Sequence, residues 1–112
     1  MKLVRFGAGQ ARAIPSHDSE GFTIAPIAEV GEGRITCARL EPGGSIGRHP
    51  AACYQLLAIV SGEGVVSGGV ARRVAAGDAV VWETGEEHET HTDMGLTAII
   101  VEGDALEVLA PE

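Results

Sequence analysis

The chain has 112 residues, of which 45% are hydrophobic, and its 16 acidic residues against 8 basic ones give a formal charge of −8. A chain of this length forms one domain, and the acidic balance argues against nucleic acid and anionic membranes as partners, because both need a basic patch. No apolar run approaches the roughly 18 residues of a spanning helix. The start lacks the apolar region of a signal peptide, and two cysteines make no disulfide framework. We therefore expect a cytoplasmic protein with reduced thiols.

The first half of the chain alternates short apolar runs with turn residues. The expected strands are 2–6, 22–27 and 34–40, with a loop over 7–19 and turns at 31–33 and 41–44. The last of these turns is Glu-Pro-Gly-Gly, a strong break in a strand pattern. No segment carries a helical apolar stripe, so the pattern favours strands.

The second half continues in the same way. The expected strands are 54–61, 65–67, 70–75, 79–82, 88–92, 96–101 and 105–109. Gly68 and Gly69 predict a two-residue hairpin turn, since such turns need positive φ. Strands that recur every 8 to 12 residues are typical of a sandwich or barrel. The prediction is an all-β fold.

Two segments carry histidines beside glycines. If the chain runs extended from His49, alternation places one set of side chains on a single face, namely His49, Ala51, Cys53, Gln55, Leu57 and Ile59. The apolar end of this set indicates that the face looks inward, so His49 and Gln55 would point into a cavity with Cys53 between them. In the later strand, His88, Thr90 and Thr92 share one face, while Glu89 and His91 share the other.

At these residues the chain resembles the cupin superfamily, as a small single-domain barrel with a degenerate first motif. The first cupin motif is G-x5-H-x-H-x3-E-x6-G, and it is matched without gaps by Gly43, His49, Gln55 and Gly62. The second is G-x5-P-x-G-x2-H-x3-N, and it is matched by Gly77, Gly85 and His88. Four positions depart from the motifs: Ala51 for histidine, Gln55 for glutamate, Glu83 for proline and Thr92 for asparagine.

The resemblance implies a double-stranded β-helix, or jelly-roll barrel, with a pocket at one end. It divides the single domain into N-terminal strands and loop (1–33), a barrel core with both motifs (34–101) and a C-terminal strand (102–112). It also implies a homodimer, and the apolar start at Leu3, Val4 and Phe6 suits pairing through an open sheet edge.

Cupins that bind a metal typically use two histidines and a carboxylate from the first motif and one histidine from the second. Here the resemblance leaves His49 and His88 as strong ligands and Gln55 as a weaker oxygen donor, for a divalent ion such as Fe, Zn, Mn, Ni or Cu. Gln55 is equally expected to hydrogen-bond a ligand or the two histidines. Cys53 would add a thiolate if a bulge turned it inward, and Ala51 would only line the pocket. The alternative is that both histidines are pocket residues without a metal, and that Cys53 is a small buried residue.

The other chemistry-bearing residues have simpler interpretations. We expect Cys37, Trp82 and Tyr54 in the core or an interface, and His17 and His91 at the surface. Four glutamates (Glu83, Glu86, Glu87 and Glu89) predict a solvated acidic rim. The leading hypothesis is a small-molecule-binding cupin with a reduced metal site, which includes a metal-dependent enzyme acting on a small polar organic substrate. The alternative is a metal-free ligand-sensing, accessory or structural cupin dimer.

Overall fold

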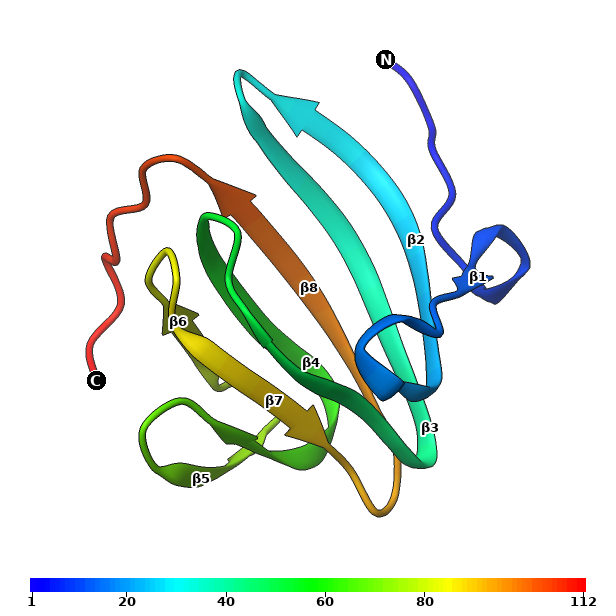
Figure 1. Cartoon of the computed structure of the whole chain (residues 1–112). Helices are drawn as coiled ribbons and strands as arrows, with labels where there is room; N and C mark the ends of the chain where they lie inside the picture. Colours follow the sequence, from blue (N-terminus) through cyan, green and yellow to red (C-terminus); the bar gives the residue numbers. More distant parts are fainter.

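A computed structural model describes all residues from 1 to 112 and shows an almost wholly β protein (Figure 1). Its elements are the 3-10 turn η1 (Ala8–Gln10), β1 (Arg12–Ala13), the 3-10 turn η2 (Ser16–Asp18), β2 (Glu20–Val30), β3 (Gly33–Pro50), β4 (Tyr54–Ser67), β5 (Ala71–Ala75), β6 (Ala79–Trp82), β7 (Glu87–His91) and β8 (Leu96–Gly103). The all-β prediction is confirmed. No helix in the structure is long and apolar enough to cross a membrane.

Two long strands turn one antiparallel sheet into a barrel. β3 pairs with β2 and β8 along its first part and with β7 from Ser45 onward. β4 pairs with β8 and β6 along its first part, and with β5 and β7 near its end. Each long strand therefore passes from one wall to the other, which closes the sheet around an interior (Figure 1). This is the jelly-roll architecture expected from the sequence.

The break expected at 41–44 is a bend inside β3 and not the end of a strand. Phe22 of β2 pairs with Leu40 of β3, and Glu20 pairs with Ser45. The β3 residues between Leu40 and Ser45 therefore bulge out of the ladder. Gly43 has φ +79°, which only glycine adopts without strain. The turn residues therefore let one strand change walls instead of ending it.

Other local predictions differ in detail. Both ends of the chain, where strands were expected over 2–6 and 105–109, run as coil along the barrel (Figure 1), because neither finds a partner strand. The hairpin after β4 has three connecting residues, since Ser67 pairs with Ala71, and neither Gly68 nor Gly69 has positive φ. The expected strand pieces 54–61 and 65–67 are one continuous β4.

The core lies between the two walls. Its buried cluster has 11 members: Ala38, Leu40, Ala51, Leu57, Ile59, Val66, Val74, Trp82, Leu96, Ala98 and Ile100. β8 illustrates the packing, because its residues alternate between buried and half-buried from Leu96 to Val101. Leu57 is 2% exposed and belongs both to this core and to the wall of a cavity. The position of that cavity is therefore set by the same apolar side chains that hold the fold.

Candidate functional site

A cavity of about 400 Å³ opens into the barrel interior. Its volume lies in the range of small-molecule sites. The apolar part of its wall is formed by Ile14, Phe22, Ile24, Ile46, Leu57, Trp82 and Ile100. The polar part is formed by Ser16, His17, Ser19, Arg34, Thr36, His49, Gln55, His88, Thr90 and Glu102. All three residues predicted as metal ligands, His49, Gln55 and His88, line this one cavity.

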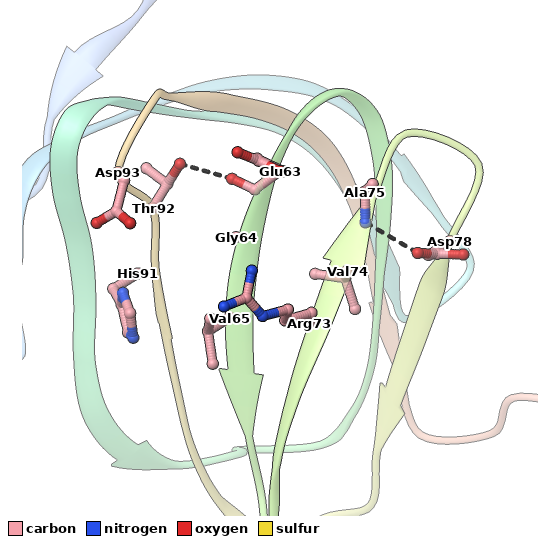
Figure 2. Close-up of a pocket in the computed structure, with 10 residues that line it drawn as sticks. All are labelled: Glu63, Gly64, Val65, Arg73, Val74, Ala75, Asp78, His91, Thr92 and Asp93. Atoms are coloured by element: carbon pink, nitrogen blue, oxygen red, sulfur yellow. Dashed lines mark hydrogen bonds between the residues drawn. The ribbon is translucent and has the colours of Figure 1, made fainter.

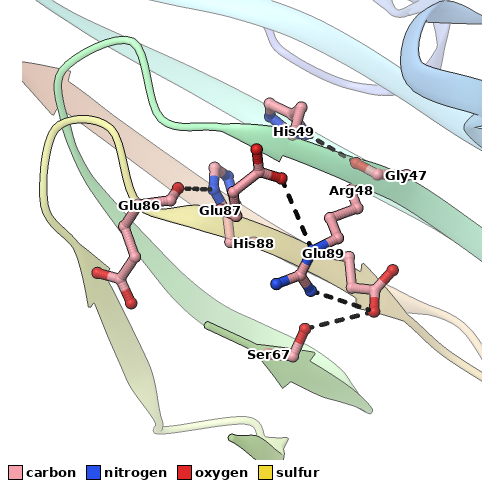
Figure 3. Close-up of polar contacts among 8 residues, drawn as sticks. All are labelled: Gly47, Arg48, His49, Ser67, Glu86, Glu87, His88 and Glu89. Carbon is pink, nitrogen blue, oxygen red and sulfur yellow. Dashed lines mark hydrogen bonds and ion pairs between the residues drawn. The ribbon is translucent and has the colours of Figure 1, made fainter. Parts of the chain in front are cut away.

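His49 and His88 face each other across the β3–β7 pair. The two residues are register partners, and their ring centroids lie 4.3 Å apart with the planes tilted by 53°. His49 Nδ1 lies 2.7 Å from the carbonyl oxygen of Gly47, and His88 Nδ1 lies 3.1 Å from that of Glu86 (Figure 3). A carbonyl oxygen only accepts, so each Nδ1 donates. When neutral, a ring held in this way has its Nε2 lone pair free for a ligand or an ion.

Burial favours the neutral form of His88. The side chain is 2% exposed, and loss of water lowers its pKa from the ordinary value. The hydrogen bond to the Glu86 carbonyl works in the opposite direction, and a charge on His49 would lower the pKa further. A neutral imidazole is the form that binds a metal or accepts a proton.

Ala51 and Cys53, the additional pocket residues suggested by strand alternation, do not line the cavity. The chain bends over 51–53 between β3 and β4, so the alternation of an extended strand does not carry through. Ala51 is buried in the core, and its carbonyl oxygen accepts from Gly85 N at 2.7 Å. Cys53 is half-buried, and its pKa is raised first by burial and then by the charge of Glu102.

A row of side chains across four strands forms another part of the wall. Glu102 is the register partner of both Arg34 and Gln55, and Gln55 is in turn the partner of Trp82. Partners in register share a face of the sheet, so all four line the cavity. Glu102 and Arg34 were not identified from the sequence. Glu102 could have been predicted by extending the strand pattern of 96–101 by one residue. Side chains two residues apart in a strand lie on the same face, so Glu102 shares the face of the buried Ala98 and Ile100.

Four rings contact one another in a series that begins at Trp82 of this row and contains two stacked pairs joined by the tilted His49–His88 pair. Trp82 packs on His88 with centroids 4.3 Å apart and planes at 26°, and His17 packs on His49 with centroids 4.4 Å apart and planes at 8°. Trp82, expected in the core, is buried there and also lines the cavity. His17, expected at the surface, is exposed but also lines the cavity. The residues around His17 give no sequence signal for a position in the cavity wall, because that position depends on a turn that packs against β3.

The acidic residues around β7 lie outside the cavity. Arg48 Nε is 3.6 Å from Glu87 Oε2, and Arg48 Nη1 is 3.7 Å from Glu89 Oε1 (Figure 3). Half-exposed pairs of this kind add little stability. Glu86 is half-buried, and its Oε1 accepts from the backbone N–H of Glu83 at 3.1 Å. Most of the expected acidic rim is therefore exposed and partly neutralised by one arginine.

The donor set fits a weak metal site and not a complete one. His49 and His88 offer two imidazole Nε2 atoms whose rings are oriented by backbone carbonyls, as in many metal sites. Gln55 adds a neutral amide oxygen in the same cavity. However, the chain holds no group of three or more His, Cys, Asp or Glu side chains arranged to hold an ion. A divalent ion here would need Gln55, water or a bound molecule to complete its usual three or four donors.

A second, smaller hollow of about 190 Å³ lies between β4, β5 and the end of β7 (Figure 2). Its wall includes His91, Asp93 and Arg73. Two of its polar groups are already engaged, since Thr92 Oγ1 donates to the Glu63 carbonyl at 2.6 Å and Asp78 Oδ2 accepts from Ala75 N at 2.8 Å. None of the predicted ligands reaches it, and His91 is exposed, as expected.

The family is identified by a match to residues 37–106, which fit the family model described as "Cupin domain". The chain belongs to the cupin family. This match spans more than half of the chain and includes both histidine motifs. The four motif glycines (Gly43, Gly62, Gly77 and Gly85) have φ between +79° and +98°, so the cupin motifs mark the backbone positions where these turns need glycine. No curated protein matches the chain.

Solved structures support the same fold. The polyketide cyclase RemF from Streptomyces resistomycificus aligns with a TM-score of 0.81 and 18% identity over 94% of this chain and 80% of that one. A predicted oxalate decarboxylase from Thermotoga maritima aligns with a TM-score of 0.76 and 22% identity over 88% and 96%. The complex of Rhodobacter sphaeroides SigE with the anti-sigma ChrR aligns with a TM-score of 0.72 and 16% identity over 84% and 48%. At these identities the similarity concerns the fold alone.

Proposed function

We propose that this cupin binds a small polar organic molecule in the barrel cavity, at a reduced metal site held by His49 and His88. The observation that supports this most is the oriented histidine pair. Both Nδ1 atoms donate to backbone carbonyls, at 2.7 and 3.1 Å, so both Nε2 atoms are available in one cavity. Packing alone would not require that both rings adopt the same tautomer.

The residues have separate roles in this proposal. His49 and His88 would hold the ion, and Gln55 would complete its coordination or orient the bound molecule. When bound, a divalent ion acts as a Lewis acid that polarises a carbonyl or activates a water. Glu102 and Arg34 supply a carboxylate and a guanidinium to the same cavity, where they can bind polar groups of a ligand. The apolar side chains of the cavity wall fit the carbon skeleton of a small organic molecule.

A chemical reaction in this cavity extends the proposal but is not required by it. Two similar structures carry enzyme names, a polyketide cyclase and a predicted oxalate decarboxylase. A third is a complex with an anti-sigma protein. Because fold does not determine function, a metal-free sensing or accessory role is the second candidate. It is favoured by Ala51 and Gln55, which replace two strong ligands of the first motif.

The test is the metal content of untagged protein, measured by elemental mass spectrometry after separate reconstitution with Fe, Zn, Mn, Ni and Cu. We expect near-stoichiometric binding of at least one ion in the wild type and loss of binding in a His49→Ala/His88→Ala double variant. His91→Ala is the matched control, because His91 is on β7 but faces the other way. Wild-type protein that stays free of every ion would refute the metal part of the proposal and favour the metal-free candidate.

A further inference from the structure

We propose that His17 is a positioning residue of the cavity, which closes it over His49 and fixes the orientation of that imidazole. The inference rests on the proposed use of this cavity as the ligand site. The observation behind it is the parallel stack of the two rings, with centroids 4.4 Å apart and planes at 8°. His17 comes from the segment before the barrel core, so the site has a component outside both histidine motifs.

The turn that carries His17 has an unusual backbone. His17 and Asp18 are the only two non-glycine residues of the chain with positive φ, at 59° and 58°. Histidine and aspartate tolerate this region better than most residues, but such a conformation persists only when surrounding contacts hold it. Two consecutive residues in this state indicate a turn that is held by its neighbours.

The contacts that hold the turn are to Gly47 on β3. The backbone N–H of Gly47 donates to Ser19 Oγ at 3.0 Å, and a Cβ at Gly47 would overlap the carbonyl oxygen of His17. Gly47 also accepts the Nδ1 hydrogen of His49 through its own carbonyl, at 2.7 Å (Figure 3). Gly47 therefore contacts both residues: it leaves room for the backbone of His17 and holds the ring of His49 by a hydrogen bond. The positions of the two stacked rings depend on the same glycine.

The stack limits what His49 can do. One face of its ring is covered by His17, its edge is held at Nδ1, and His88 lies on another side with centroids 4.3 Å apart. His49 is left with one defined direction for its Nε2. His17 itself is exposed and His49 is half-buried, so the stacked His17 ring covers part of His49 that would otherwise face solvent.

The experiment uses Trp82, the only tryptophan of the chain, as a reporter inside the cavity. Acrylamide quenching of its fluorescence is measured on metal-free, ligand-free protein. We expect the quenching constant to rise by about twofold or more in His17→Ala, because the mouth then opens locally. His17→Phe keeps a flat ring on His49 and should restore the wild-type value. Gly47→Ala should act like His17→Ala while keeping the histidine, and His91→Ala should change nothing.

A second measurement separates positioning from simple shielding. Nitrogen NMR of the histidine rings reports which nitrogen is protonated. Without the stacked His17 ring, the His49 imidazole can turn away from the Gly47 carbonyl, so we expect both tautomers of His49 in His17→Ala and a return to the Nδ1–H tautomer in His17→Phe. Melting curves show which variants are folded, and only folded variants are compared. Unchanged quenching and an unchanged His49 tautomer in folded His17→Ala would overturn the inference. Because no metal or ligand is present, this failure is distinct from failure of the proposed function.

Discussion

Acidification is expected to destabilise the metal-free protein through His88. Burial lowers the pKa of this histidine in the folded state below its ordinary value, which is near 6.5. The unfolded chain therefore binds a proton more readily than the folded one as the pH falls through about 6.5. Above about pH 6.5, His88 is neutral in both states and does not change the free energy of unfolding. Below that pH the free energy of unfolding falls progressively, until the pH reaches the lowered pKa of His88 in the folded state.

The size of the effect is limited by the linkage relation. One differentially protonated group changes the free energy of unfolding by at most about 1.4 kcal/mol per pH unit. For a chain of 112 residues, each kcal/mol corresponds to roughly 4 °C in Tm. His88 is 2% exposed and lies between Trp82 and His49, so protonation in place brings no compensating hydration. The expected signature is a Tm that falls by a few degrees between about pH 7 and pH 5.

The assay compares thermal unfolding of wild type and His88→Phe at several pH values, with EDTA present. Phenylalanine keeps a flat ring against Trp82 but removes the titrating group, and it also removes the hydrogen bond to the Glu86 carbonyl. We expect a variant that is less stable at pH 7 by about 1 kcal/mol but has a shallower pH dependence. His91→Gln, on the exposed face of β7, should keep the wild-type slope. An identical slope in His88→Phe would refute the assignment to His88.

Three further predictions concern the cavity and its frame. Leu57→Ala should cost about 2–5 kcal/mol of stability in chemical denaturation and enlarge the cavity, since Leu57 is part of both core and wall. Gly62→Ala should lower the Tm much more than Gly69→Ala. Gly62 has φ +83°, and an added Cβ would overlap a carbonyl oxygen of the facing turn, whereas a Cβ at Gly69 would meet no atom. Gln55→Glu should tighten Zn²⁺ binding in calorimetry about tenfold or more, because a carboxylate is a stronger donor than an amide; equal or weaker binding would show that Gln55 is not a metal donor.

The fold was predictable because its signals are local. Gly77 and Gly85 mark turns whose positive φ values exclude most other residues, and the alternation of His88, Thr90 and Thr92 matches their burial on one face of the chain. The error at 41–44 is informative. A Glu-Pro-Gly-Gly segment can end a strand or let it bulge, and only the partner strands decide which occurs. The same lack of partners explains why the apolar ends of the chain form no strand.

The candidate site was predictable only in part, because half of it depends on long-range register. His49, Gln55 and His88 were found from motif spacing, and they line one cavity. Glu102 reaches the same cavity only because β8 pairs with both β3 and β4 in one register. His17 reaches it only because Gly47 leaves room for its backbone.

These two additions change how the degenerate motif is interpreted. Gln55 is a neutral residue where the motif has glutamate, but its register partner Glu102 places a carboxylate on the same wall of the cavity. Ala51 replaces a histidine, but His17 adds an imidazole to the cavity, stacked on His49. The functional groups missing from the motif are thus present in the cavity at other positions of its wall. This arrangement is why we place ligand recognition, with the metal as a weak component, ahead of a complete metal centre.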